Sequence, residues 1–240
     1  MGDERVKNEA MEIMGLVQLL PRLVVFDLDY TLWPFYCECR SKREMPKLYP
    51  QAKGILCALK DKGVGVAIAS RSPTPDIANT FLEKLGIKSM FVAQEIFSSW
   101  THKTDHFQRI NRRTQIPYNE MLFFDDEDRN IDAVSKMGVT SILVGNGVNL
   151  GALRQGLSKF SQIVRLQKET NKDGKEFQKN QVHQKRRRNK SSTIFETVKD
   201  EDQTDHVSQF SPKLKLVLAK HITKQYLQTE GSQHSLWRSL

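Results

Sequence analysis

A chain of 240 residues with 38% hydrophobic and 27% charged residues is long enough for one ordinary domain plus a tail, or for two small domains. Its longest apolar runs are strand-sized, well short of the ~18 residues of a membrane span, and residues 1–15 lack the apolar core and cleavage site of a secretory signal. Three cysteines, Cys37, Cys39 and Cys57, are an odd number and favour reduced thiols over a disulfide framework. We therefore expect a cytoplasmic protein that does not enter a membrane.

Between residues 20 and 160, short apolar runs alternate with amphipathic segments. The runs are apolar on both faces, as in parallel strands covered on both sides, and span residues 23–26, 64–69, 89–92, 121–124 and 139–144. The segments between them have apolar residues three or four apart, as helices do, and span residues 51–62, 76–85, 104–114 and 129–137. Residues 6–17 have the same pattern and precede the first strand. The alternation predicts a three-layer, Rossmann-like α/β sandwich with a five-stranded parallel sheet.

The formal net charge of +9 is concentrated near the C-terminus. Residues 1–160 carry 21 basic and 19 acidic side chains, and residues 161–240 carry the remaining 16 basic and 9 acidic ones. Gln, Lys, Asn, Ser and Thr replace the hydrophobic periodicity in this last third. We therefore divide the chain into an N-terminal helix in residues 1–19, a folded domain in residues 20–160, and a basic, mostly disordered tail in residues 161–240 with one helical pattern at 212–227.

Polar side chains follow four of the predicted strands, in the order Asp27 and Asp29, Ser70 and Arg71, Lys103, then Asp125 and Asp126. Because the carboxyl ends of parallel strands meet at one edge of a sheet, we expect these side chains to lie together. Crowded carboxylates need a cation, and oxygen ligands without a nearby His/Cys set favour Mg²⁺ over Zn²⁺. A lysine and a hydroxyl can hold phosphate oxygens beside them. The set predicts phosphoryl transfer through an aspartyl phosphate.

These residues also carry a resemblance to a known family. The pattern Asp27-x-Asp29-x-Thr31, followed by Ser70, Lys103, and Asp125-Asp126 with Asn130, resembles the four motifs of the aspartate-nucleophile phosphatases in the haloacid dehalogenase (HAD) superfamily. The phrases FDLDYTLWPF, ASRSPT, HKTDHF and FFDDEDRNI are similar to those of its magnesium-dependent phosphatase family, over roughly residues 20–160. The resemblance implies a HAD-like fold and a Mg²⁺-dependent phosphomonoesterase.

The resemblance assigns catalytic roles to the matching residues. Asp27 would be the nucleophile, and Asp29 would protonate the leaving group and then deprotonate the attacking water. Thr31 would orient Asp27 through a hydrogen bond. Ser70 and Lys103 would hold the oxygens of the transferred phosphoryl group.

The resemblance also implies a metal site. Mg²⁺ would be bound by a carboxylate oxygen of Asp27, the main-chain carbonyl of Asp29 and one carboxylate of the acidic pair. Asp126 is favoured there, because its spacing to Asn130 matches the family pattern. Asp125 would then lie beside Lys103.

The sequence has no room for a cap domain over the expected site. Residues 32–50 provide only a flap, and the helix at 76–85 follows Ser70 closely, so a phosphate on a large molecule could reach Asp27. Trp33, Phe35 and Tyr36 on the flap could stack on a substrate ring or anchor the flap to the domain. The resemblance accordingly implies protein phosphotyrosine, or a sugar phosphate such as fructosamine 6-phosphate, and does not choose between them.

Other polar residues near the motifs have simpler interpretations. Arg71 could contact the substrate or pair with a surface acid. Glu127 and Asp128 are typical of a solvated helix start, where acids are favoured. His102 and His106 are expected at the surface beside Lys103.

The basic tail leaves alternatives open. The run Lys185–Lys190 could direct nuclear import, bind nucleic acid weakly, or belong to a solvated linker. A nucleic-acid end phosphatase recruited by the tail is therefore an alternative function, and a non-catalytic binding module on the same fold is another. We expect a monomer that binds a phosphorylated protein or a small phosphate ester.

Overall fold

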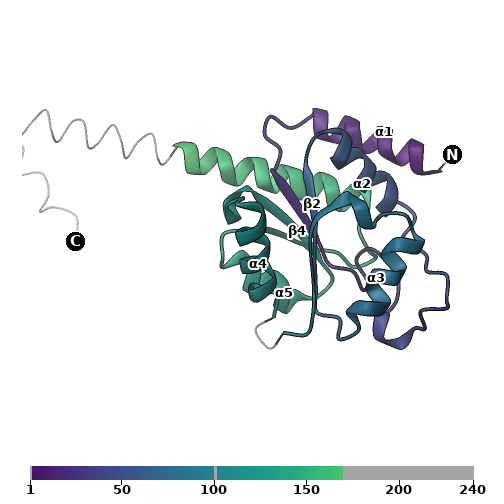
Figure 1. Ribbon diagram of the computed structural model, residues 1–240. Helices are drawn as coiled ribbons and strands as arrows, with labels where there is room; N and C mark the ends of the chain where they lie inside the picture. Colours follow the sequence, from purple (N-terminus) through teal and green to yellow (C-terminus); the bar gives the residue numbers. More distant parts are fainter. Residues whose placement is uncertain (1, 100–101, 170–240) are drawn as a thin grey trace, which may run out of the picture. The chain divides into compact units, whose positions relative to one another are not determined.

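The computed structural model describes residues 2–99 and 102–169, which are built around one parallel sheet (Figure 1). Its strands are β1 (Leu23–Phe26), β2 (Gly65–Ser70), β3 (Phe91–Ile96), β4 (Met121–Asp125) and β5 (Thr140–Leu143), in the order β3-β2-β1-β4-β5. All four neighbouring pairs are parallel, which confirms the predicted sheet. The third strand lies later than the predicted residues 89–92, because a short 3-10 helix, η2 (Lys88–Met90), precedes it.

Alternate residues of β1, β2 and β4 enter two separate hydrophobic layers. In β1, Val24 and Phe26 belong to the layer that also contains residues of α1 (Gly2–Gly15), α2 (Ala52–Asp61) and α3 (Pro75–Lys84). Leu23 and Val25 belong to the opposite layer, with residues of α4 (Thr104–Thr114) and α5 (Asp128–Ser135) (Figure 1). Both faces of the sheet are therefore covered, which explains why the strands are apolar throughout and confirms the three-layer sandwich.

The N-terminal helix packs against α2 on the outside of the first layer. Its buried residues, Val6, Ala10, Ile13 and Met14, recur at the three- and four-residue spacing of one helix face. The helix begins at Gly2, earlier than the predicted start at residue 6, because the first turn is polar and carries no hydrophobic signal.

A further helix over residues 150–169 was not predicted from the sequence. Leu153 and Leu157 attach it to the layer that contains α1 and α2. Its residues 161–169 lie beyond the domain end predicted at residue 160, because this polar, exposed stretch resembles a tail in composition. The remainder of the predicted tail, with the helix at 212–227 and the basic run at 185–190, lies outside the described residues.

The connections at the carboxyl edge of the sheet are short. Between β1 and α2 the described chain contains only the flap and the 3-10 helix η1 (Cys37–Cys39), and α3 begins shortly after β2 ends. Another short 3-10 helix, η3 (Tyr118–Glu120), precedes β4 at the opposite edge. These lengths agree with the predicted capless fold. None of the described helices has the length and apolar character that crossing a bilayer requires.

Loops that follow two different strands are joined next to the first acidic motif. The Val148 N–H donates a hydrogen bond to the Thr31 carbonyl (2.9 Å), and the Tyr49 N–H donates one to the Leu32 carbonyl (2.9 Å). Gly147 makes this close approach geometrically feasible. Its φ is +68°, in the left-handed region, and a Cβ there would overlap the ring of Tyr49.

We expect Gly147→Ala to lower the free energy of unfolding by about 2–4 kcal/mol. Alanine is strained in the left-handed region, and its Cβ would displace the ring of Tyr49. Gly145→Ala in the same loop is the matched control, because a Cβ at Gly145 meets nothing within 4 Å. Urea unfolding of both variants measures the difference. Equal stabilities would contradict this account of the loop.

Candidate active site

The predicted site residues converge on a cavity at the carboxyl edge of the sheet. The order of the strands places β2 and β3 on one side of β1, and β4 and β5 on the other, so the chain reverses direction across the sheet beside β1. The cavity has a volume of about 400 Å³. Seven predicted residues line it: Asp27, Asp29, Ser70, Arg71, Lys103, Asp126 and Asn130. Asp125 and Thr31 are buried behind it.

Lys103 is a buried cation between two buried carboxylates. Its ammonium lies 2.6 Å from Asp27 Oδ1 and forms a second ion pair with Asp125 Oδ2, while its side chain is only 2% exposed. Burial lowers the pKa of Lys103, but the two carboxylates more than offset this and raise it above the ordinary value. Lys103 therefore stays charged in the folded protein.

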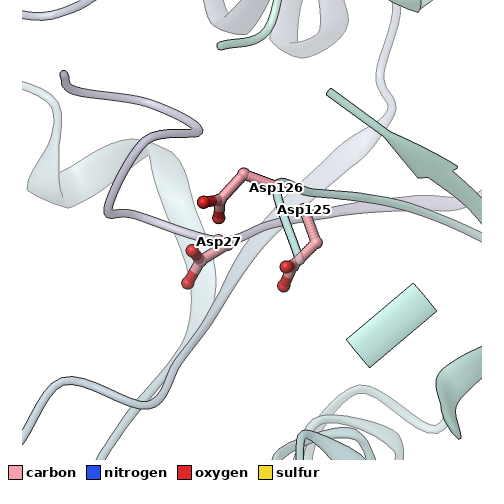
Figure 2. A group of neighbouring side chains, drawn as sticks. All are labelled: Asp27, Asp125 and Asp126. Carbon is pink, nitrogen blue, oxygen red and sulfur yellow. The ribbon is translucent and has the colours of Figure 1, made fainter. Parts of the chain in front are cut away.

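A third carboxylate gives this cluster a surplus of negative charge. Asp27, Asp125 and Asp126 each place an oxygen within 4.8 Å of the others (Figure 2). Lys103 is paired with two of these carboxylates, those of Asp27 and Asp125. Burial, together with the nearby Asp125, raises the pKa of Asp27 well above its usual value and that of Asp126 to about 6. Three clustered carboxylate oxygens, with no histidine or cysteine in the group among the described residues, fit a hard divalent cation such as Mg²⁺.

The two neighbouring aspartates have different surroundings. Asp125 accepts hydrogen bonds from the Glu127 N–H (2.8 Å) and from Asn130 Nδ2 (3.1 Å) in addition to its ion pair with Lys103. Asp126 forms no hydrogen bond or ion pair with any other described residue. Its oxygens are therefore the more available ligands, although Asn130 contacts Asp125 rather than Asp126, to which the spacing had linked it.

The side chain of Asp29 is held by donors from the flap. Its Oδ1 accepts hydrogen bonds from Trp33 Nε1 (2.7 Å) and from the Cys37 N–H (3.2 Å). Burial raises the pKa of Asp29, and these two donors oppose that shift. Asp29 lines the same cavity as Asp27, as the sequence predicted, but its contact with Trp33 was not anticipated.

The hydrogen bond from Thr31 to Asp27 is not present. The Thr31 hydroxyl is buried and has no hydrogen-bond partner in residues 2–99 and 102–169. The carboxylate of Asp27 is held by Lys103 instead. The hydrogen bond through which the resemblance had Thr31 orient Asp27 is therefore absent from the described residues, and the catalytic role of Thr31 stays a prediction.

Comparison with known proteins agrees with this geometry. The sequence model of a family described as acid phosphatase matches residues 19–47 and 41–163. Human magnesium-dependent phosphatase 1 is 42% identical over 158 residues, which are 60% of this chain and 89% of the human protein. The chain belongs to the magnesium-dependent phosphatase family. The resemblance of its motifs is thereby confirmed.

A further relative agrees with this placement in the superfamily. A HAD-like hydrolase superfamily protein of Schizosaccharomyces pombe is 36% identical over 144 residues, which are 50% of this chain and 83% of the yeast protein. The solved structure of a HAD-superfamily hydrolase from Ehrlichia chaffeensis aligns with a TM-score of 0.47 at 12% identity, over 59% of this chain and 98% of that one.

Glu127 is not the solvated helix start that the sequence predicted. Its carboxylate accepts two hydrogen bonds from Arg129 (2.7 and 2.8 Å) and one from Asn130 Nδ2 (3.0 Å), and it lies 3.6 Å from Arg71. The pairing of Glu127 with Arg71 cannot be read from local sequence, because Arg71 follows a different strand. Arg71 therefore pairs with an acid, as one interpretation predicted, and because it also lines the cavity its contact with a substrate stays a prediction.

The flap aromatics divide into anchors and one exposed ring. Trp33 and Phe35 are buried and stack on each other, and both contact Phe81 edge-on. Tyr36 is 50% exposed and lines the cavity. The anchoring interpretation therefore holds for Trp33 and Phe35, and only Tyr36 can meet a substrate.

His106 is fully buried, whereas the sequence predicted a surface position. Its Nε2 lies 2.9 Å from the carbonyl oxygens of both Ser70 and Phe97, so Nε2 carries the hydrogen that joins the ends of β2 and β3. Its ring also stacks on Phe97. These partners are distant in sequence, which is why its position was missed. His102 is only partly buried.

We expect His106 to make the protein less stable in mild acid. Burial lowers its pKa from 6.5 to about 4, so the unfolded chain takes up a proton first and stability is lost as pH falls below 6.5. Between pH 7.5 and pH 5.0 the loss from this group is about 2 kcal/mol. His106→Gln keeps a hydrogen-bond donor but cannot titrate in this range. Its free energy of unfolding, measured with urea at the two pH values, should therefore fall by about 2 kcal/mol less than that of the wild-type protein. An identical pH dependence in both proteins would contradict this role.

Proposed function

We propose that this chain hydrolyses phosphomonoesters through an aspartyl phosphate on Asp27, with protein phosphotyrosine or a sugar phosphate such as fructosamine 6-phosphate as the substrate. As a member of the magnesium-dependent phosphatase family, the chain is a Mg²⁺-dependent phosphoric monoester hydrolase. The residue roles and the substrate are the proposed part.

One observation carries the proposal: Asp27 lies at the cavity with a lysine at 2.6 Å on one side and a second acid, Asp29, two residues away on the same wall. A nucleophile needs a group that keeps it charged and aimed, and a leaving group needs a proton donor. Lys103 serves the first need and Asp29 the second. Retention of the whole set argues against a non-catalytic binding module.

The reaction has two displacements at phosphorus. In the first, a carboxylate oxygen of Asp27 attacks phosphorus, the ester P–O bond breaks, and the leaving oxygen takes a proton from Asp29. In the second, water attacks the same phosphorus and gives a proton to Asp29, and the bond from phosphorus to the Asp27 oxygen breaks. Both side chains are thereby restored, and inorganic phosphate is released.

The surrounding residues hold the transferred group. Lys103 and the Ser70 hydroxyl face its oxygens, where negative charge accumulates in the transition state. Bound Mg²⁺ neutralises the surplus charge of the carboxylates and polarises phosphate oxygens. Asp27, the main-chain carbonyl of Asp29, and Asp126 would hold the ion, while Asp125 keeps Lys103 in place.

The rim of the cavity supports a substrate whose phosphate is presented from outside. The described residues include no cap above it, and the exposed side chains of Tyr36 and Arg129 stand at its edge. An aromatic ring could stack on Tyr36, and sugar hydroxyls could bind the charged groups beside it. A nucleic-acid end phosphatase would depend on the basic tail, and residues 170–240 of that tail lie outside the described part.

We expect Asp27→Asn to abolish Mg²⁺-dependent release of phosphate from p-nitrophenyl phosphate, a phosphotyrosyl peptide and fructosamine 6-phosphate, with a loss of at least about a thousandfold, because the amide is a poor nucleophile. Phosphate release from each compound is measured. Asp128→Asn, at an exposed acid on the first turn of α5, is the matched control and should keep full activity. Full activity of Asp27→Asn would refute the mechanism, and failure of wild-type protein on the last two compounds would refute the substrate assignment.

We expect Asp126→Asn to change the Mg²⁺ requirement and Asp125→Asn to change the stability. Asp126→Asn should raise the Mg²⁺ concentration for half-maximal activity by about tenfold or more, with little change in stability. Asp125→Asn should lower the free energy of unfolding by about 2 kcal/mol, because a charged partner of buried Lys103 is lost. Magnesium titration and urea unfolding distinguish the two effects. The reverse pattern would assign the metal to Asp125.

A further inference from the structure

The indole of Trp33 points its only hydrogen-bond donor at Asp29. The distance from Nε1 to Oδ1 is 2.7 Å, and the Cys37 N–H reaches the same oxygen at 3.2 Å. No described residue donates to Oδ2. One carboxylate oxygen of Asp29 is therefore occupied by two donors from the flap, and the other is free beside the cavity that Asp29 lines.

The position of the indole is set by the fold rather than by Asp29. Trp33 is fully buried; its ring stacks on Phe35 with centroids 5.5 Å apart and meets Phe81 of α3 edge-on at 6.1 Å. The backbone is fixed as well, because the N–H groups of Thr31, Leu32 and Trp33 all donate to the Leu28 carbonyl. The donor is thus held in place whether or not Asp29 is there to receive it.

The geometry points to Trp33 as a positioning residue for Asp29: by occupying Oδ1, its N–H leaves Oδ2 as the oxygen that carries the proton for the leaving group. This inference rests on the proposed function, in which Asp29 is the general acid. Two N–H donors already occupy Oδ1, so a rotation of the carboxyl that turned its O–H toward them would break both hydrogen bonds. Nothing in the motif assigns a role to the residue four places after the second aspartate.

The role predicts a dependence on the leaving group. When Asp27 attacks, the P–O ester bond breaks and its electron pair goes to the leaving oxygen. A nitrophenolate is stable without a proton, whereas an alkoxide must receive one as the bond breaks. If the proton on Asp29 is misplaced, cleavage of an alkyl phosphate should therefore slow more than cleavage of a nitrophenyl phosphate.

We expect Trp33→Phe, which keeps a ring but removes the donor, to lower kcat/KM for 2-phenylethyl phosphate about tenfold or more. For p-nitrophenyl phosphate the loss should stay below about threefold. The ratio kcat/KM reports the first displacement, so hydrolysis of the aspartyl phosphate does not enter it. Equal losses on both substrates, or no loss on either, would overturn the inference.

Phe81→Leu is the matched control. It loosens the packing around the same indole but keeps the N–H, so it should leave the ratio of the two kcat/KM values unchanged. A changed ratio in this variant would make the selectivity a packing effect and also overturn the inference. The proposed function is tested separately by Asp27→Asn. This variant should lose activity on both substrates, whatever the result for Trp33→Phe.

A spectroscopic measurement keeps the inference testable if Trp33→Phe does not fold. The chain has three tryptophans, so the indole N–H signal of Trp33 in ¹⁵N-labelled protein is assigned by elimination with Trp100→Phe and Trp237→Phe. Asp29→Ala removes the acceptor and should shift this signal upfield. A Trp33 signal that does not move in Asp29→Ala would contradict the hydrogen bond on which the role depends.

Discussion

The ion pairs of Lys103 are the interaction on which the site depends. A charged ammonium with 2% of its side chain exposed is tolerable only because two carboxylates surround it. Those carboxylates come from neighbouring strands whose register pairs Phe26 with Phe124, so Asp27 and Asp125 leave the sheet side by side. The lysine stands at the start of α4 and thereby joins one helical layer to the two central strands. The same contact thus links the register of the two strands, the position of α4 and the orientation of the Asp27 carboxylate.

The charge balance of this cluster links folding to chemistry. One lysine against three carboxylates leaves negative charge that burial makes costly, and the raised pKa of Asp126, about 6, expresses that cost. A divalent cation offsets the charge and needs oxygen ligands in this arrangement. The same group that is unfavourable for the fold without a cation is therefore the group that we propose as a Mg²⁺ ligand.

The sequence was informative where one local pattern determines the structure. Strands covered on both faces are apolar throughout, and polar residues at their carboxyl ends must meet, so the sheet and the convergence of Asp27, Ser70 and Lys103 could be predicted. Contacts between segments that are distant in sequence could not be predicted in this way. His106 is buried because it bonds the carbonyls at the ends of two strands, and Glu127 is also paired with Arg71, which arrives from another strand. The helix over residues 150–169 was missed because its exposed half has the composition of a tail.

The flap combines a rigid interior with a small exposed edge. Trp33 and Phe35 bury its first part in the core, and Lys84 of α3 donates hydrogen bonds to the carbonyls of Lys42 (2.6 Å) and Glu44 (2.8 Å) in its second part. A segment tied at both ends cannot fold down over a substrate as a lid does. Among the described residues, the side chains at the rim are therefore those placed to contact a leaving group, and no described segment is free to close over Asp27 and exclude water from it.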